Sequence, residues 1–247
     1  MSVKLTVVGC SPAWPNPGGA QSGYLLEGPG RLLLDCGPGV LAKLREHESW
    51  PELDAIAITH WHLDHWGDLV PWVWGGTLGP GRGTKTPQLW VPPKGRELLS
   101  TIGEPLGSPE MFEEAFDVHE YAEDETFEAA GFDVTPHRVL HYQLLAFGFR
   151  ASANGTVIGY SGDSGPSDAL VQIARDADLF VCEATLLRPH PEGGTRGHLS
   201  SEEAQEAFEA SGARRLLLTH RPFERPLDGQ FELARDGLEI EVSKDPG

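Results

Sequence analysis

The feature that most constrains this chain is the stretch Thr59–His65, which places three histidines and one aspartate within six positions. It follows the apolar run 55–58, Ala-Ile-Ala-Ile, which is typical of a short buried strand. The cluster therefore lies where a strand ends and the chain turns toward a helix, which is where α/β folds place their chemistry. Since imidazole and carboxylate groups together bind zinc, manganese or iron, the stretch predicts a metal site.

The spacing divides these four groups into two sets. His60 and His62 are two positions apart, so in an extended chain they point to the same side and can hold one metal ion. Asp64 continues this two-residue spacing and His65 breaks it, so Asp64 and His65 can turn toward a second ion. A chance cluster of histidines on a polar loop is the alternative, and its position directly after a buried strand argues against it.

The pattern His-x-His-x-Asp-His after an apolar strand resembles the signature of the metallo-β-lactamase fold superfamily. The resemblance extends from Val7 to His220, and it is strongest to the ribonuclease Z-like and cyclic-nucleotide phosphodiesterase-like branch. It implies one hydrolase domain over residues 1–247, with the α/β fold of a four-layer αββα sandwich and metals at one edge. Periodicity alone predicts an α/β domain with a strand-rich first half and later βαβ units.

The resemblance also implies the ligands outside the motif. Asp163, in the segment Ser-Gly-Asp, corresponds to the carboxylate that bridges both metals in the family. His220 follows an apolar strand and a threonine, as His60 does, so two similar strand ends would face each other across the metals. His141 corresponds to the third histidine of the first metal, with His137 as the alternative. His119 is expected on a strand face at the surface.

The implied centre thus has two divalent ions, with zinc as the first choice and manganese or iron as alternatives. A hydroxide would bridge them and leave the pocket cationic. The residues divide as follows: His60, His62 and His141 on one ion, Asp64, His65 and His220 on the other, and Asp163 on both.

Asp64, His198 and Glu183 are expected to take part in catalysis. His198 resembles the histidine of the His-x-Ser/Thr motif in the ribonuclease Z-like branch, which serves transition-state stabilisation or proton donation; a capping-loop histidine before Ser200 is the alternative. Glu183 resembles its acidic partner. Asp64 is expected to orient the nucleophile and take up its proton, and Asp35 is expected to orient the metal histidines.

Charge and chain length narrow the substrate. The chain carries 37 acidic and 19 basic residues, a formal net charge of −18, which argues against an extended nucleic-acid footprint. Transfer-RNA-processing members of the branch carry a long basic arm between the third histidine and the bridging aspartate. Here the segment from His141 to Asp163 holds a tight Asn154-Gly155 turn instead. The substrate is therefore expected to be a small anion, such as a cyclic nucleotide.

These observations predict a dinuclear-metal phosphodiesterase. The alternatives are a lactone or thioester hydrolase on the same site, a tRNA 3′-processing ribonuclease, and a non-catalytic metal-binding scaffold. The chain starts without a signal-peptide pattern and has no membrane-length apolar run, and its three cysteines are far apart, so a cytoplasmic protein that does not bind membranes is expected. A homodimer stays open.

Local patterns also predict the elements. Strands are expected at 4–8, 24–26, 31–35, 55–58, 88–91, 118–121, 126–129, 132–136, 145–151, 156–160, 179–183 and 214–219. Helices are expected at 40–46, 94–102, 109–115, 167–174 and 201–211. The Gly- and Trp-rich stretch from Trp72 to Trp90 is expected either in the core or on the pocket wall.

Overall fold

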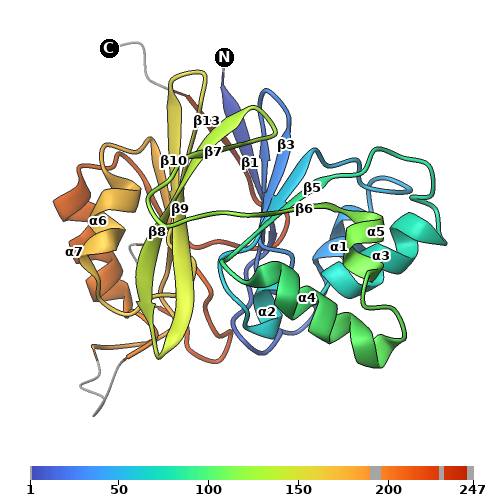
Figure 1. The fold of residues 1–247 in the computed structure, drawn as a ribbon. Helices are drawn as coiled ribbons and strands as arrows, with labels where there is room; N and C mark the ends of the chain where they lie inside the picture. Colours follow the sequence, from blue (N-terminus) through green and yellow to red (C-terminus); the bar gives the residue numbers. More distant parts are fainter. Residues whose placement is uncertain (1, 190–195, 228–230, 244–247) are drawn as a thin grey trace.

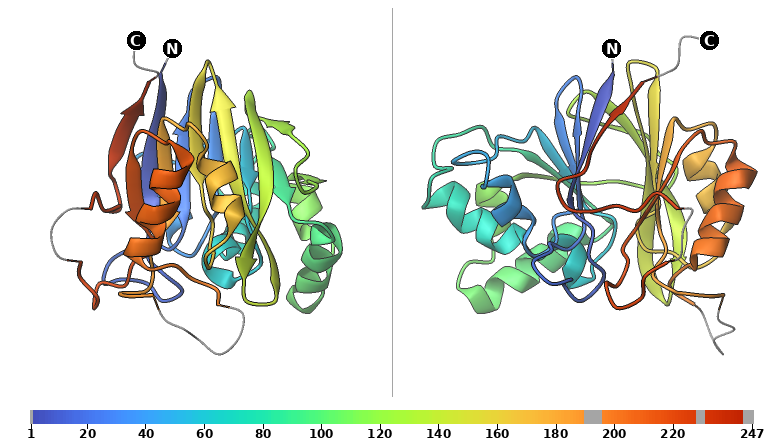
Figure 2. Two further views of the ribbon diagram at one scale, coloured as in Figure 1. Left: turned by 90° about the vertical axis from the view of Figure 1, so that its left-hand side faces the viewer. Right: turned by 180° about the vertical axis from the view of Figure 1, so that it is seen from behind.

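A computed structural model describes residues 2–189, 196–227 and 231–243, and within these ranges two β-sheets pack face to face. Helices cover the outer face of each sheet, so the layers run helix, sheet, sheet, helix (Figure 1). This arrangement confirms the predicted αββα sandwich. Two further views show the same layers, with β1 (Val3–Gly9) and β13 (Glu239–Val242) side by side near the ends of the described chain (Figure 2).

In spatial order, the first four strands of the first sheet pair antiparallel, and the fourth to the seventh strands pair parallel. Its spatial order is β13 (Glu239–Val242), β1 (Val3–Gly9), β2 (Gly23–Glu27), β3 (Arg31–Leu34), β4 (Ala55–Ala57), β5 (Gln88–Val91) and β6 (Asp117–Glu120). Parallel strands end at the same edge of a sheet, so the residues after β3 and β4 come together there.

The second sheet has its parallel strands at one side, where β10, β11 and β12 run in one direction. Its spatial order is β12 (Leu216–Thr219), β11 (Leu179–Glu183), β10 (Thr156–Tyr160), β9 (Leu144–Ala153), β8 (Phe132–His141) and β7 (Phe127–Ala129). The parallel run brings Asp163, Glu183 and His220 to one edge, because each lies at or just after the end of its strand.

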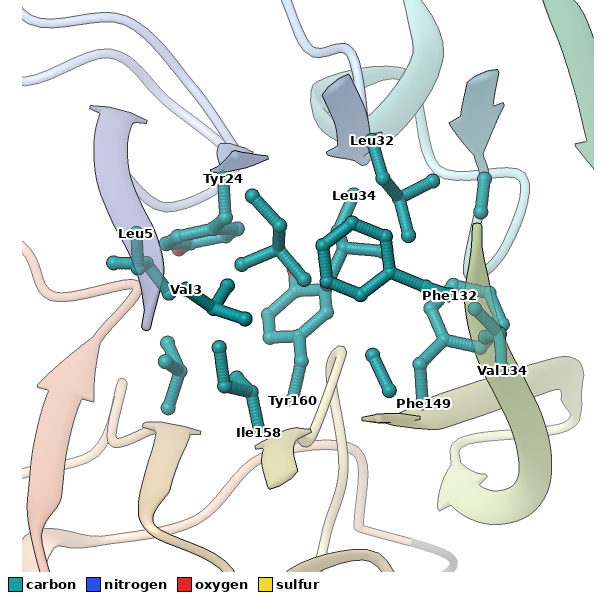
Figure 3. Packing of buried hydrophobic residues seen from close by; sticks show 14 of the residues in the cluster. Val3, Leu5, Tyr24, Leu32, Leu34, Phe132, Val134, Phe149, Ile158 and Tyr160 are labelled. Carbon is teal, nitrogen blue, oxygen red and sulfur yellow. The ribbon is translucent and has the colours of Figure 1, made fainter. Parts of the chain in front are cut away.

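The main core lies between the two sheets. In β1 buried and half-buried side chains alternate over the first positions, as expected for a strand with one face toward the core. Figure 3 shows Leu5, Tyr24 and Leu34 of the first sheet pointing toward Phe149 and Ile158 of the second. Burial of apolar side chains at about 25 cal/mol per Å² is the main term that holds the sheets together.

Two further clusters pack helices onto the outer faces. The first sheet is covered by α1 (Val40–Leu44), α3 (Leu69–Thr77), α4 (Gly95–Gly103) and α5 (Met111–Ala115), with a 3-10 turn at Glu104–Leu106. The second sheet is covered by α6 (Asp168–Ala174) and α7 (Ser201–Ser211), and the short α2 (Leu63–Trp66) lies at one end of the sandwich. Within the described ranges, none of these helices is long and apolar enough to cross a membrane.

Most elements begin and end within two residues of the predicted positions, and α7 matches its prediction at both ends. Its first turn is held by a capping box in which Ser200 and Glu203 satisfy each other's backbone N–H groups. Strand β13 was not predicted, because its four residues carry two exposed glutamates.

Helix α3 was also missed, because Gly75 and Gly76 are poor helix formers. The structure gives the reason for Gly75. A Cβ atom at this position would lie 2.2 Å from the ring of Trp50, which packs against the helix. Trp72 is buried and meets Trp50 edge-on, with ring centroids 5.4 Å apart. Trp72 therefore lies in the core and not on the pocket wall.

Strand β8 continues to His141, five residues beyond the predicted end at Pro136. Proline cannot donate to a ladder, so a strand that continues past it needs an explanation. In the structure β7 pairs with β8 only as far as Val134, so Pro136 has a ladder partner on one side alone, Phe149 of β9. The Pro136 carbonyl accepts from the backbone N–H of Asp124, outside the ladder, and the proline nitrogen faces the same side, so the missing N–H costs no ladder hydrogen bond.

Candidate metal centre

The ends of strands from both sheets converge at one edge of the sandwich and place the predicted ligands together. His60 follows β4, Asp163 follows β10 and His220 follows β12, while His141 is the last residue of β8. Helix α2 supplies Asp64 and His65 from its first turns. The described residues contain three groups whose ligand-type atoms lie within 4.8 Å of one another: His60, His62, His141 and Asp163; Asp64, His65, Asp163 and His220; and Glu183, His198 and His220.

Asp163 belongs to the first two groups, and each of its oxygens faces a different one. Oδ2 lies 4.0 Å from His60 Nε2 and 3.9 Å from His141 Nε2. Oδ1 lies 3.3 Å from His65 Nε2 and 3.5 Å from His220 Nε2. A carboxylate held in this way can bind one cation with each oxygen.

The remaining contacts within each group are also short. His62 Nδ1 lies 2.8 Å from His141 Nε2 in the first group. In the second group, Asp64 Oδ2 lies 3.1 Å from His220 Nε2 and 3.4 Å from His65 Nε2. Six of the seven residues in the two groups are 5% exposed or less, and His62 lies at the rim.

Three atoms that face into the cluster indicate whether these residues fit a metal ion. Among the described residues, His60 Nε2, His65 Nε2 and Asp163 Oδ1 are buried and lack a hydrogen-bond partner. Leaving such atoms unpaired costs roughly 1–3 kcal/mol each, more for a charged group, so buried polar atoms are rarely left in this state. Unpaired imidazole and carboxylate atoms that converge on one point fit a divalent cation, which would pair with all of them.

The outer nitrogen of four of the imidazoles is held by a neighbouring group. His141 Nδ1 donates to the carbonyl of Gly197 at 2.7 Å, and His65 Nδ1 lies 2.6 Å from Asp35 Oδ2. His60 and His220 meet the hydroxyls of Thr59 and Thr185 at 3.0 and 2.9 Å. Each contact fixes the ring so that Nε2 faces the cluster, as in metal sites with oriented histidines.

Burial and neighbouring charges give the histidines of the metal-free centre different protonation states. Burial lowers the pKa of His60, His62 and His141, so these rings are neutral bases at pH 7. Burial also lowers the pKa of His65, but the carboxylates of Asp163 and Asp35 outweigh it and raise this pKa well above its usual value. Binding a cation to His65 Nε2 must therefore release a proton.

Two buried tyrosines tie the sheets together behind the cluster. Tyr160 of β10 donates to Asp35 Oδ2 at 2.7 Å, and Asp35 follows β3 in the other sheet. Tyr24 of β2 meets the hydroxyl of Thr219 at 2.6 Å, next to His220. The two rings are 4.7 Å apart. The backbones of Asp35 and His220 both lie in the left-handed region, with φ of 59° and 57°, so surrounding contacts must hold them there.

We expect Tyr160→Phe to lower the free energy of unfolding of the metal-free protein by about 1.5–3 kcal/mol, because it removes a buried hydrogen bond to a carboxylate. Tyr24→Phe is the matched control. It removes a bond between two neutral hydroxyls, and its expected cost is about 0.5–1.5 kcal/mol. Urea unfolding of both variants measures the difference. Equal costs would contradict a charge-assisted bond at Tyr160.

His198 and Glu183 form a second buried pair beside the cluster. His198 Nδ1 lies 2.9 Å from Glu183 Oε1 and 3.9 Å from Asp163 Oδ2. Glu183 also accepts hydrogen bonds from the backbone N–H groups of Ser164 and Thr185. Burial lowers the pKa of His198, but the charge of Glu183 and its hydrogen bond raise it to about 9 in the metal-free protein. The His198 side chain is 16% exposed, so a substrate can reach it.

The other candidate histidines lie away from the cluster. His137 Nδ1 meets Asp124 Oδ1 at 2.7 Å on the outer side of β8. His119 stacks on Trp90 and pairs with Asp117 at 2.9 Å, half-buried on the face of β6 as expected. His141 is thus the histidine of β8 that the fold brings into the first group.

Sequence reasoning missed the groups that orient the ligands from outside. Thr185, Tyr160, Tyr24 and the carbonyl of Gly197 have no motif of their own. One signal was present for Thr219, since the Thr-His pair that ends β12 repeats the pair at Thr59.

Comparisons with known proteins agree with this geometry. A family model described as "Beta-lactamase superfamily domain" matches residues 30–221. The probable metallo-hydrolase YhfI of Bacillus subtilis is 30% identical over 225 residues, which cover 89% of this chain and 87% of YhfI. The YhfI crystal structure has a TM-score of 0.82 to this fold, and the match covers 98% of this chain and 100% of that chain.

Two further relatives match along most of their length. The uncharacterized protein Rv1339 of Mycobacterium tuberculosis is 35% identical over 227 residues, which cover 90% of this chain and 82% of that protein. Ribonuclease Z of Myxococcus xanthus is 26% identical over an alignment of 304 positions, covering 97% of this chain and 98% of that enzyme.

Proposed function

Because this chain belongs to the metallo-β-lactamase superfamily, in its ribonuclease Z-like branch, we propose that it is a dinuclear-metal phosphodiesterase for small substrates such as cyclic nucleotides. The observation that carries the proposal is the set of buried, unpaired atoms of His60, His65 and Asp163, found among the described residues, which converge between the two sheets. A metal-dependent hydrolase needs such a set, and a merely structural cluster would pair these atoms internally.

In this proposal each ion takes three residues of its own and shares a fourth. His60, His62 and His141 would hold one ion, Asp64, His65 and His220 would hold the other, and Asp163 could serve both. Neutral imidazoles with few carboxylates favour zinc, and manganese or iron would also fit. Divalent ions in such a site supply Lewis acidity and a water-derived nucleophile at neutral pH.

The protein groups around the ions have separate tasks. Asp64 orients the attacking water and accepts a proton from it. Burial raises the pKa of Asp64, but the hydrogen bond from His220 and the charge of the neighbouring His65 outweigh it and lower this pKa, so Asp64 is better suited to orienting water than to storing the proton. His198 donates a proton to the leaving oxygen from Nε2, since Glu183 holds its Nδ1.

Two features support a small phosphodiester as substrate. The pair His198–Glu183 supplies a protonated donor beside the metals, as the poor leaving oxygen of a phosphodiester requires. The connection from β9 to β10 is the two-residue turn at Asn154-Gly155, so the segment between His141 and Asp163 has no arm that could grip a transfer RNA. The net charge of −18 also disfavours a long polyanion.

One substrate panel tests the proposal. It contains bis(p-nitrophenyl) phosphate, 2′,3′- and 3′,5′-cyclic nucleotides, a precursor transfer RNA, a lactone and a thioester. Each is assayed with the protein as purified, after chelation, and after return of zinc, manganese or iron. We expect turnover of the small phosphodiesters, loss of at least about 10³-fold on chelation, and recovery with metal.

The other functions predict different results from the same panel. A lactone or thioester hydrolase would act on the carbonyl substrates alone, and a processing ribonuclease would prefer the transfer RNA. A scaffold would turn over nothing, whatever its metal content. Any of these three results would overturn the proposal.

A further inference from the structure

The hairpin of β8 and β9 turns beside the metal centre through the two residues Tyr142 and Gln143, with His141 and Leu144 paired at its base. Tyr142 is 43% exposed, although it directly follows a buried candidate ligand. Its backbone φ is 49°, in the left-handed region that tyrosine rarely adopts. A turn at this place would be easier to form with glycine or asparagine.

The other end of β9 provides an internal comparison. There the chain makes a two-residue turn through Asn154 and Gly155, with φ of 55° and 81°. These are the residues that such turns prefer, and they lie far from the metal centre along the ten residues of β9. The chain thus uses favourable residues where the turn only connects strands, and a strained aromatic residue where the turn meets the site. Strain of this kind gathers at functional sites.

The ring of Tyr142 has a defined seat. Its centroid lies 5.0 Å from that of His141 and 5.7 Å from that of His198, and it stands nearly perpendicular to the His198 ring at 80°. Gly197 makes room for it, because a Cβ atom there would lie 2.3 Å from Tyr142 Cε2. The ring is therefore held beside the proposed proton donor and the first metal group at once.

We propose that Tyr142 is a stacking platform for the base of a nucleotide substrate. This inference rests on the proposed phosphodiesterase function and names the part of the substrate outside the reacting phosphate. With the phosphodiester at the metals and the leaving oxygen near His198, the adjoining nucleoside lies within reach of the exposed ring. Aromatic side chains stack on any base without reading its edge, so the site would accept several nucleotides.

The platform acts on binding more than on the chemical step. A contact made equally in the bound and transition states changes KM and leaves kcat nearly the same. Loss of the ring should therefore raise KM for cyclic nucleotides by about 5- to 100-fold, and it should affect a substrate without a base much less.

The test compares Tyr142→Asn with Tyr142→Phe. Asparagine tolerates the left-handed backbone but removes the ring, whereas phenylalanine keeps the ring and the strain. Kinetics are measured on adenosine 3′,5′-cyclic phosphate and on the matching methyl riboside 3′,5′-cyclic phosphate, which lacks the base. Calorimetric titration with adenosine 5′-monophosphate and with ribose 5-phosphate gives a second readout that needs no turnover.

In the wild type and in Tyr142→Phe, we expect a preference for the base-containing member of each pair. In Tyr142→Asn that preference should fall by about 5- to 100-fold in both KM and Kd. An equal change for substrates with and without the base would overturn the platform while leaving the phosphodiesterase intact. A wild-type protein that cleaves no phosphodiester would overturn both.

Discussion

Replacing Asp163 by asparagine is expected to prevent binding of the metal pair and to lower kcat on phosphodiesters by about 10⁴-fold or more, the scale seen when one member of a catalytic unit is removed. One carboxylate oxygen faces each histidine group, at 3.9 Å from His141 and 3.3 Å from His65. The amide of asparagine offers one oxygen, and its NH₂ group would point two donors at a cation. Metal analysis and calorimetric titration after chelation measure the loss.

Asp124→Asn is the matched control. Asp124 also pairs with a histidine, at 2.7 Å from His137, but it lies exposed and outside the cluster. This variant should keep the wild-type metal content and turnover. If Asp163→Asn bound two ions per chain with unchanged affinity, the bridging role of Asp163 would be wrong.

His198→Ala is expected to lower kcat on phosphodiesters by at least about 10²-fold while the metal content stays unchanged. The reason is the loss of the proton donor. His198 is that donor, and its Nδ1 lies 3.9 Å from Asp163 Oδ2. His198 also lies in a third ligand-type group with Glu183 and His220. Metal analysis therefore separates the two roles, because loss of an ion along with activity would make His198 a ligand. His137→Ala serves as the control for removal of a histidine outside the cluster.

Glu183→Gln tests the same role through pH. Its carboxylate raises the pKa of His198, which lies at about 9 in the metal-free protein. A donor must be protonated, so kcat falls as the pH rises through this pKa. Removal of the charge lowers the pKa and moves the fall to lower pH, by about one pH unit or more. Bound cations lower this pKa in both proteins, so the measured quantity is the difference between the two pH profiles.

The Thr59–His65 motif could be predicted from the residues, and the resemblance to a known family implied the ligands outside it. His60, Asp163 and His220 each lie within three residues of the end of a short apolar strand, and such ends meet at one edge when the strands are parallel. Buried apolar runs and glycine turns are local signals, so they are visible in the sequence. Helix α3 was not, since Gly75 is required by the ring of Trp50, a contact across 25 positions.

The choice between His137 and His141 needed the hairpin itself. Both lie on β8, four positions and therefore about 13 Å apart along the strand, so their sequence contexts differ little. The tip of the hairpin meets the strand ends of the other sheet, and the middle of the strand does not. Because β8 continues past Pro136, His141 rather than His137 reaches the cluster. The strand can continue because Pro136 pairs with β9 and not with β7.

From local patterns, the sequence by itself determined an α/β domain and the kinds of ligand in Thr59–His65, and its resemblance to a known family implied the sandwich and the remaining ligands. The tertiary structure alone decided how the ligands are held. Asp35 and Tyr160 are 125 positions apart, and the hydrogen bond between them exists because two sheets pack face to face. Tyr142 and His198 are 56 positions apart, and the fold of the second half of the chain brings their rings within 5.7 Å. Contacts between distant segments depend on the geometry of the whole sandwich, which leaves no local trace in the chain.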